Sequence, residues 1–467
     1  MRILLSLLWT ALLFRSAAAQ PLRIDWQKCL GGSGREGMDN NQSLGIRPTD
    51  DGGFIVGATT DSRDGDVTNP HGDSDFWIVK LDARGSIQWQ RTFGGSNADV
   101  LQGIAPTSDG GFIAVGTTQS VDGDLTGSVL TGDPSRSPRV PGQDDAWVIK
   151  LDAGGALQWH RVYGTTGATP DWLYSVVQNS DGNYAVAGYT NSDFRSFDPP
   201  TSQANAGGSA AWVLILDRTD GRILRQEVFG GQGEEGAFGI LQSRDGGFLL
   251  TGFTTSDFGA TDDSARDLMA LKVDGSLQRQ WMRVLVGDHA DEAYSALQND
   301  RGEFVLVGYT KSATGDVHID PAHDPASHDS DAVVADLDET TGRVMWMRTL
   351  GGSGGERASG IVEGPGRYLV AAWTTSVDGD VTPRGCIGSE NGWVLELDKN
   401  DGRLRWERVL GGSGPEKTLA VAAAGRGGFV VAGSTRSPDD PGCPSADVSG
   451  FHGGGDDVWV IRLHPGR

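Results

Sequence analysis

The sequence predicts an all-β fold, a seven-bladed β-propeller of four-stranded blades. The first observation is a unit of about 56 to 70 residues that returns along the whole chain. The second is that one half of this unit stands near the start of the chain and the other half near its end. The third is that 70 glycines fall at turn positions between short apolar runs, against only 19 prolines, which favours a folded β-protein over a low-complexity chain.

The clearest copy of the unit runs from Phe76 to Gly95. Two runs of apolar, aromatic and β-branched residues flank Asp82-Ala83-Arg84-Gly85, which is typical of two strands joined by a tight turn. Asp can hydrogen-bond the backbone ahead of it and Gly can adopt positive φ, so we predict a hairpin. The Asp of this turn recurs at Asp152, Asp217, Asp274, Asp338 and Asp398. A tryptophan of the second strand recurs at Trp26, Trp89, Trp159, Trp281, Trp346 and Trp406, and Arg225 replaces it once.

Each predicted blade has strands A, B, C and D from the axis outward. We expect strand A near residues 42–48, 100–106, 172–178, 236–242, 292–298, 357–363 and 417–423. Its middle carries small residues, as the crowded centre of a propeller requires, at Gly45, Gly103, Ser175, Gly239, Ser295, Gly360 and Ala420. Strand C carries Trp77, Trp147, Trp212, Trp393 and Trp459, with Met269 and Val333 in the two other copies.

The two half-units predict how the ring closes. The run Ile24 to Leu30 matches strand D without a strand C before it, and Val458 to Leu463 matches strand C without a strand D after it. An N-terminal strand that completes the last blade would remove the open sheet edges.

The connections are unequal in length. A–B and C–D links are tight, whereas B–C links are long and variable, and in a four-stranded blade they emerge on the same face as the D–A links. Loops on a rigid scaffold usually carry binding residues. Any particular function should therefore lie in the long loops that begin near Asp61, Ser120, Asn191, Ser256, Lys311, Ser376 and Arg436.

Residues 1–19 resemble a secretory signal peptide, with Arg2, an apolar run from Ile3 to Phe14, and Ala17-Ala18-Ala19 before Gln20. We expect residues 20–467 to form a single propeller domain that is secreted or periplasmic, without membrane insertion, and monomeric. The net charge of −23 would repel nucleic acid and anionic membranes.

Three cysteines are present, and an oxidising compartment allows one pair. Cys386 and Cys443 lie in equivalent long loops of the last two units and are the predicted disulfide. Cys29 lies within a strand and is expected to be buried as a small apolar residue.

The repeated pattern LDxxGxxxWxxxxGG followed by SDGG, together with the loops TTDSRDGDVT, TTQSVDGDLT and TTSVDGDVT, resembles the repeats of secreted bacterial seven-bladed propeller proteins. The resemblance covers nearly all of the chain after residue 19 and implies the fold far more than an activity. The segments TGRVMW and DGRLRW are distantly similar to quinoprotein dehydrogenase propellers. Those proteins have eight blades and a vicinal cysteine pair over the quinone, whereas this chain has seven units and no adjacent cysteines.

An acidic residue stands at the start of strand A in six units, and these residues are expected at the mouth of the central channel. They are Asp99, Asp171, Glu235, Asp291, Glu356 and Glu416, with Asn41 in that place in blade 1 and Glu36 displaced by an insertion. Like charges so arranged raise one another's pKa or recruit a hard cation such as calcium. The alternative is that each carboxylate accepts hydrogen bonds from backbone N–H groups of its own turn.

Two further clusters could bind metal. Pairs of carboxylates bracket a glycine in three DGD loops, and calcium is the candidate cofactor there, although an Asx-type turn explains the same pattern; these are Asp64 and Asp66, Asp122 and Asp124, and Asp378 and Asp380. The blade 5 loop holds His318, His323 and His328 among aspartates, which are zinc-ligand types at a spacing typical of no zinc motif.

No nucleophile elbow, HExxH motif or phosphate loop occurs in the sequence. We therefore expect a non-catalytic binding or structural module that presents an acidic, long-loop face to a protein or glycan ligand. The alternative is a metal-dependent hydrolase or lyase, or a quinoprotein-like oxidoreductase, with its site at the acidic channel mouth.

Overall fold

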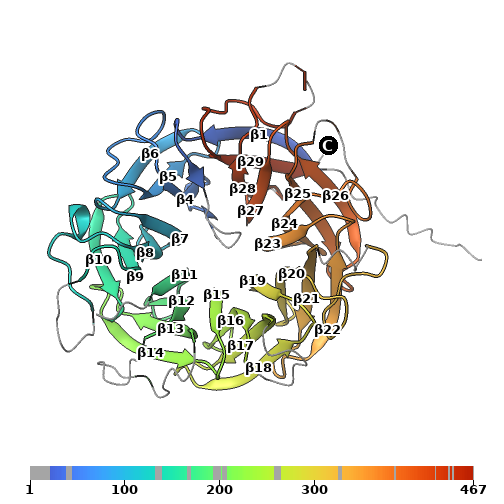
Figure 1. Cartoon of the computed structure of the whole chain (residues 1–467), viewed down its shortest axis with the longest axis horizontal. Helices are drawn as coiled ribbons and strands as arrows, with labels where there is room; N and C mark the ends of the chain where they lie inside the picture. The colour runs from blue at the N-terminus through green and yellow to red at the C-terminus, as the bar shows by residue number, and fades with distance from the viewer. Residues whose placement is uncertain are drawn as a thin grey trace, which may run out of the picture.

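Seven antiparallel sheets radiate from a central opening in the computed structural model, with the innermost strand of each sheet beside the opening (Figure 1). The structure describes residues 22–37, 45–131, 139–165, 170–192, 201, 208–256, 265–323, 329–382, 385, 387–425, 427–439, 442–443 and 446–465. The predicted all-β propeller of seven four-stranded blades is confirmed. The predicted signal peptide, residues 1–19, lies outside the described residues.

Each blade meanders outward from strand A to strand D. Blade 1 has β2 Glu36–Gly37, β3 Ile46–Pro48, β4 Phe54–Thr60, β5 Asp75–Leu81 and β6 Ile87–Phe93. Blades 2 and 3 have β7 Asp99–Pro106, β8 Phe112–Thr118, β9 Asp145–Leu151, β10 Leu157–Tyr163, β11 Asp171–Gln178, β12 Tyr184–Thr190, β13 Ala210–Leu216 and β14 Ile223–Phe229. Blades 4 and 5 have β15 Glu235–Gln242, β16 Phe248–Thr254, β17 Asp267–Val273, β18 Arg279–Leu285, β19 Asp291–Gln298, β20 Phe304–Thr310, β21 Asp331–Leu337 and β22 Val344–Leu350. Blade 6 has β23 Glu356–Gly364, β24 Arg367–Thr374, β25 Asn391–Asp398 and β26 Leu404–Leu410.

Blade 7 is built from both ends of the described chain, in the order β1-β29-β28-β27. Its strands are β27 Glu416–Ala423, β28 Phe429–Thr435, β29 Asp457–Pro465 and β1 Leu22–Leu30. The pairing of β1 with β29 places Cys29 opposite Trp459 and Leu30 opposite Val458. The predicted closure by an N-terminal strand is therefore confirmed.

Blade 1 departs from the predicted register. Its inner strand was expected at residues 42–48, but two short strands, β2 and β3, share β4 as their partner. Glu36 begins β2 opposite Thr60, the position that the strand A acid takes in the other blades. Glu36 therefore holds the place predicted for Asn41, which lies outside the described residues.

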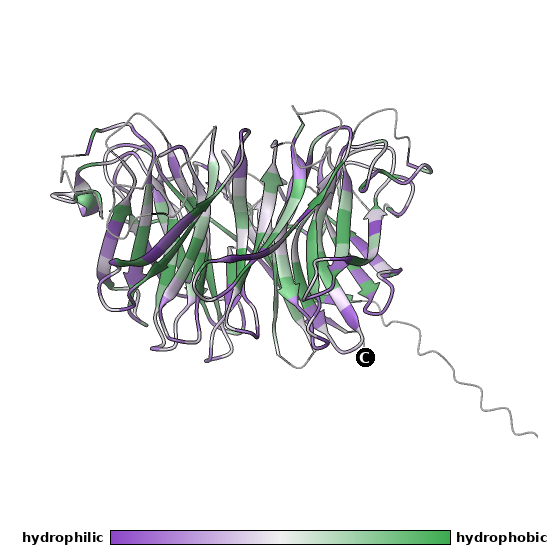
Figure 2. Ribbon diagram, turned by 90° about the horizontal axis from the view of Figure 1, so that it is seen from below, coloured by the Kyte–Doolittle hydropathy of each residue, from purple (hydrophilic) through white to green (hydrophobic). Residues whose placement is uncertain are grey.

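The two faces of the ring differ, as Figure 2 shows from the side. Tight A–B and C–D turns lie along one face, here called the tight-turn face. The B–C and D–A connections lie along the other, here called the long-loop face, where one B–C link reaches from Thr118 to Asp145 and includes the short 3-10 helix η2, Gly123–Leu125.

The core lies within and between blades. The predicted strand C tryptophans are fully buried, and the indole of Trp77 donates a hydrogen bond to Gln90 on the next strand of its own blade at 2.9 Å. The strand D tryptophans instead reach the adjacent blade, where the Trp346 ring packs on Gly402 and the Trp26 ring on Gly85. Arg225, which replaces this tryptophan once, donates from Nη1 to the carbonyl of Gly275 at 2.8 Å and so contacts the same kind of turn.

Among the described residues, no helix is both long and apolar enough to cross a membrane.

Candidate functional site

The strand A acids are buried at the junctions between blades. In the four blades with glutamate, a threonine at the end of strand B donates to Oε1 over 2.6–2.9 Å. The N–H of the glycine four residues before each acid donates to Oε2 over 2.7–2.9 Å. In the aspartate blades a serine hydroxyl donates to Oδ2 over 2.8–3.2 Å. Each carboxylate thus accepts hydrogen bonds at its own junction.

Burial dominates the electrostatics of these acids. It raises the pKa of Asp99 to about 6 and that of Asp171 and Asp291 to about 7, against hydrogen bonds that lower it. Burial also raises the pKa of Glu36, Glu356 and Glu416.

In five of the seven blades strand C begins with an aspartate, which approaches the strand A acid of the next blade; blades 3 and 6 have Ala210 and Asn391 at this position. At the junction of blades 1 and 2, a side chain on Gly94 would meet Asp75 Oδ1 at 2.1 Å and Asp99 Oδ2 at 2.6 Å. At the junction of blades 5 and 6, Gly351 lies in the same way between Asp331 and Glu356. Only glycine leaves room for both carboxylates, which explains the first glycine of the repeated GG pair.

The carboxylates of the DGD loops accept hydrogen bonds from the same GG turns. The Asp64 carboxylate accepts from the N–H of Ser33 at 2.7 Å, and the Asp66 N–H donates to the Gly31 carbonyl at 2.8 Å. Equivalent side-chain bonds join Asp122 to Ser96 at 2.7 Å and Asp378 to Ser353 at 2.8 Å. Asp66, Asp124 and Asp380 accept from the first glycine N–H at 3.2, 3.0 and 3.3 Å. These carboxylates therefore accept backbone hydrogen bonds from a different turn, so the side-chain bonds are not those of a local Asx turn.

Three histidines bridge carboxylates of adjacent blades, a feature that sequence reasoning missed. His323 Nδ1 lies 2.9 Å from Asp331 of its own blade, and its Nε2 lies 3.6 Å from Asp380 of the next. The same bridges are His452 between Asp457 and Asp66, and His71 between Asp75 and Asp124. Every blade with a DGD loop therefore follows a blade that supplies a histidine, a correlation that the sequence contained.

Of the three predicted histidines of blade 5, the structure describes His318 and His323. His323 forms the bridge just described, His318 Nδ1 lies 3.3 Å from the Gly315 carbonyl, and His328 lies outside the described residues. No group of three or more His, Cys, Asp or Glu that could hold a metal occurs among the residues that the structure describes.

The cysteines divide into two classes. Cys29 is a buried free thiol in β1, whereas Cys443 is disulfide-bonded. Cys386, its predicted partner, lies outside the described residues.

The inner ends of blades 3 to 5 carry aromatic side chains that form one cluster, here called the aromatic arc. Its members are Trp172, Tyr174, Tyr189, Phe238, Phe253, Tyr294 and Tyr309. Trp172 stacks on Tyr189 across the strand pair, with ring centroids 6.0 Å apart and an interplanar angle of 10°. Tyr174 contacts Phe238 of the next blade edge-to-face at 5.2 Å.

Among the residues that the structure describes, the arc has no counterpart in blades 7, 1 and 2. The second residue of strand A pairs with the second-to-last residue of strand B in every blade, and these pairs differ chemically. They are Trp172 with Tyr189, Gly236 with Phe253, Glu292 with Tyr309 and Arg357 with Trp373 in blades 3 to 6. They are Lys417 with Ser434, Gly37 with Thr59 and Val100 with Thr117 in blades 7, 1 and 2.

Two arginines extend the arc. The Arg266 guanidinium lies 4.0 Å from the centre of the Phe253 ring and donates to Glu292 at 2.7 Å. The Arg357 guanidinium lies 4.0 Å from the Tyr309 ring and donates to the Tyr294 hydroxyl at 3.2 Å. Cation–π contacts of this kind stabilise the position of both guanidinium groups.

A pocket of about 220 Å³ opens between blades 3 and 4 at the long-loop face. It is lined by Pro170, Tyr174, Tyr189, Asn191, Ser209, Glu234, Phe238, Phe253 and Arg266. Tyr174, Phe238 and Phe253 are buried, while Asn191 and Glu234 are exposed, so the pocket has an aromatic floor and a polar rim. The sequence did contain a signal for this site. The second-to-last residue of strand B is aromatic in blades 3 to 6, as Tyr, Phe, Tyr and Trp, and in no other blade.

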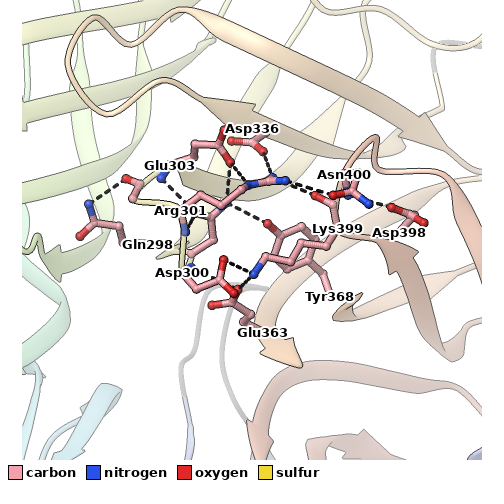
Figure 3. A network of polar contacts seen from close by, with 12 residues as sticks. Gln298, Asp300, Arg301, Glu303, Asp336, Glu363, Tyr368, Asp398, Lys399 and Asn400 are labelled. Atoms are coloured by element: carbon pink, nitrogen blue, oxygen red, sulfur yellow. Dashed lines mark hydrogen bonds and ion pairs between the residues drawn. The ribbon is translucent and has the colours of Figure 1, made fainter. Parts of the chain in front are cut away.

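The tight-turn face carries a polar network at the junction of blades 5 and 6 (Figure 3). Arg301 donates to Glu303 at 2.6 Å and to Asp336 at 3.3 Å, and Lys399 pairs with Glu363. Burial, followed by the like charge of Glu303, raises the pKa of Asp336 to about 7. Lys399 of blade 6 also pairs with Asp300 of blade 5, so the network ties the two blades together.

Comparisons with known proteins show similarity of fold. No family model matches the sequence. The regulatory protein FlaEY of Caulobacter vibrioides is 24% identical over 388 residues, which cover 77% of this chain and 39% of that protein. The chain thus spans about two fifths of the length of this curated relative.

Among solved structures, a chain of the mitotic checkpoint complex aligns with a TM-score of 0.50 at 8% identity, covering 92% of this chain and 95% of that one. BamB from Moraxella catarrhalis aligns at 0.39 with 13% identity, covering 94% and 100%. A quinohemoprotein alcohol dehydrogenase from Pseudomonas putida HK5 aligns at 0.43 with 10% identity, covering 95% and 76%. At such identities the likeness is one of fold, and no ligand or activity follows from it.

Proposed function

We propose that the chain is an exported, monomeric binding module that presents the long-loop face of blades 3 to 6 to a glycan or protein ligand. The observation that carries this proposal is the chemical difference between blades at one shared position. Blades 3 to 6 place aromatic or charged side chains there, and the other three blades place mainly small or aliphatic ones beside a single lysine. A packing requirement of the fold would apply to every blade alike, so this difference favours recognition.

Export is supported by two features. Residues 1–19 resemble a signal peptide, and Cys443 is disulfide-bonded, which is typical of oxidising compartments. The net charge of −23 suits solubility and disfavours nucleic acid as a ligand.

The repeated acids support a scaffold role. The strand A carboxylates and the DGD carboxylates accept hydrogen bonds from hydroxyls and backbone N–H groups, so a calcium ion would compete with donors already in place. We expect chelation to leave the melting temperature unchanged. A lower melting temperature after chelation, restored by added calcium, would identify a calcium-stabilised module instead.

The experiment that tests the function is a binding screen of the purified mature protein against a glycan array and a peptide array, with metal analysis of the same sample. We expect saturable binding of one ligand class without its chemical turnover. Stoichiometric metal together with turnover of the bound ligand would favour the enzyme alternative. Failure to bind on both arrays would contradict the proposed function.

A further inference from the structure

We infer that the pocket between blades 3 and 4 binds a single neutral pyranose ring at the end of a glycan. The inference rests on the proposed function and narrows it to one site and one ligand class. The size of the pocket, its aromatic lining, its rim and its charge support this ligand.

The size of the pocket suits one small ring. Its volume of about 220 Å³ lies below the range of about 300 to 1,000 Å³ that is usual for drug-sized ligands, so the pocket suits a small ligand group. A chain of sugars would extend from the opening into solvent, since the pocket lies on the outer surface of the long-loop face.

The wall of the pocket offers one half-buried ring, Tyr189, on which a sugar ring can stack, and the rings of the floor are buried beneath it. Phe238 and Phe253 pack with ring centroids 5.4 Å apart, and Tyr174 closes the side at 5.2 Å from Phe238. Aromatic faces carry negative partial charge, and the axial C–H groups of a pyranose carry positive partial charge. The stacked pair Trp172 and Tyr189 holds the wall rigid, so little ordering is needed when the ligand binds.

The rim offers hydrogen-bonding groups that are not used within the protein. Among the described residues, the side chains of Asn191 and Glu234 make no intramolecular hydrogen bond, and both are exposed at the pocket opening. An amide both donates and accepts and a carboxylate accepts, so together they match vicinal hydroxyl groups.

The charges select a neutral ligand. A ligand cation would need a free aromatic face to bind. The Arg266 guanidinium already covers the Phe253 face at 4.0 Å and would repel such a cation. Arg266 is also paired with Glu292 at 2.7 Å, and Glu234 stands on the rim. An acidic sugar would therefore face an unpaired carboxylate and a neutralised arginine, within a protein of net charge −23.

Saturation-transfer NMR tests the inference with the methyl glycosides of glucose, galactose, mannose and N-acetylglucosamine, and with methyl glucuronide as the acidic probe. We expect transfer to at least one neutral glycoside. Asn191→Ala and Glu234→Ala should each weaken its binding by about three- to tenfold, the usual effect of one lost hydrogen bond. Both side chains are exposed and unpartnered, so the variants should fold normally.

The matched control is Gln119→Ala, which removes an amide at the same position of blade 2, where no aromatic arc exists. Binding that is unchanged in the two rim variants, or stronger for methyl glucuronide, overturns the inference. A protein that binds on the peptide array but takes up no glycoside also overturns it and leaves the proposed function standing. Only failure on every array and in every NMR sample contradicts both.

Discussion

Glycine is required at the outer turns because a tryptophan of the preceding blade occupies the space of a side chain. Gly402 has φ of 69°, and a Cβ there would lie 2.3 Å from the Trp346 ring. Gly366 has nearly the same φ, 68°, with nothing within 4 Å of its Cβ position. Comparing substitutions at these two positions therefore distinguishes the effect of backbone strain from the effect of the tryptophan contact.

We predict that Gly402→Ala destabilises the protein much more than Gly366→Ala. Both changes carry about 1 to 2 kcal/mol of left-handed strain. Gly402→Ala adds the displacement of a packed indole, about 1 to 3 kcal/mol more. Urea denaturation of the two variants measures the difference, and equal losses would show that the tryptophan contact contributes nothing.

At the residue scale, the positions of the acids could be predicted but not their orientation. A repeated carboxylate at the start of an inner strand can point across the channel or into the neighbouring blade. The hydrogen-bond donors that fix the orientation come from another strand and another turn, as Thr374 and Gly352 do for Glu356. The aromatic arc was missed for a related reason, because Tyr189 and Phe253 resemble ordinary strand residues when each copy of the unit is considered alone.

At the element scale, one tie between strand C and the A–B turn occurs with opposite charges in different blades. Lys80 and Lys272 on strand C pair with Asp51 and Asp245 on the turn, at 2.8 and 2.9 Å. In blade 5 the strand residue is Asp336 and the turn residue is Arg301. The geometry of the junction therefore needs a charge pair more than a particular sign.

We predict that Arg301→Ala lowers the free energy of unfolding by about 2 to 3 kcal/mol at pH 8, because it leaves the buried Asp336 carboxylate without its cation. The loss should shrink at pH 5, where Asp336, with a pKa of about 7, is protonated. The control is Arg343→Ala, an exposed arginine on a nearby turn. A loss that is the same at both pH values would show that the charge of Asp336 is irrelevant.

Most strands were predicted within about two residues because each blade repeats its own turn chemistry. The exception is the inner strand of blade 1, where Glu36 and Ile46 belong to one strand position but are separated by an insertion. Periodicity cannot assign a register across an insertion that has no copy elsewhere in the chain.

At the scale of the whole molecule, the buried acids couple stability to pH. Asp99, Asp171 and Asp291 have pKa values of about 6, 7 and 7, so the folded state holds protons that the unfolded chain has lost above about pH 4. Stability from these groups is present below pH 4 and is lost as the pH rises to 7. For Asp51, burial would raise the pKa, but hydrogen bonds from Lys80 and Thr49 outweigh it and lower the pKa to about 2, so this pair loses stability only in stronger acid.

We therefore predict a melting temperature that is highest near pH 5 and falls toward pH 8. Each pH unit over which one acid is protonated only in the folded state is worth about 1.4 kcal/mol. Calorimetry across this range measures the slope, and Asp171→Asn, which cannot ionise, should flatten it. A melting temperature that rises from pH 5 to pH 8 would contradict the assigned burial of these acids.

The architecture of the whole molecule was predictable because it follows from repetition and from two complementary half-units, whereas the binding surface follows from the exceptions. The ring places those exceptions together, since blades 3 to 6 are consecutive and their inner strands lie side by side around the opening (Figure 1).

The central claim is that the long-loop face of blades 3 to 6 recognises the ligand while the repeated elements serve as scaffold. Hydrogen-exchange mass spectrometry, with and without a saturating ligand from the array screen, tests it most directly. We predict slower exchange in peptides that cover residues 170–192, 208–211, 232–238 and 265–268. Slower exchange confined to blades 7, 1 and 2, or to the tight turns near residues 106–112, would contradict the account.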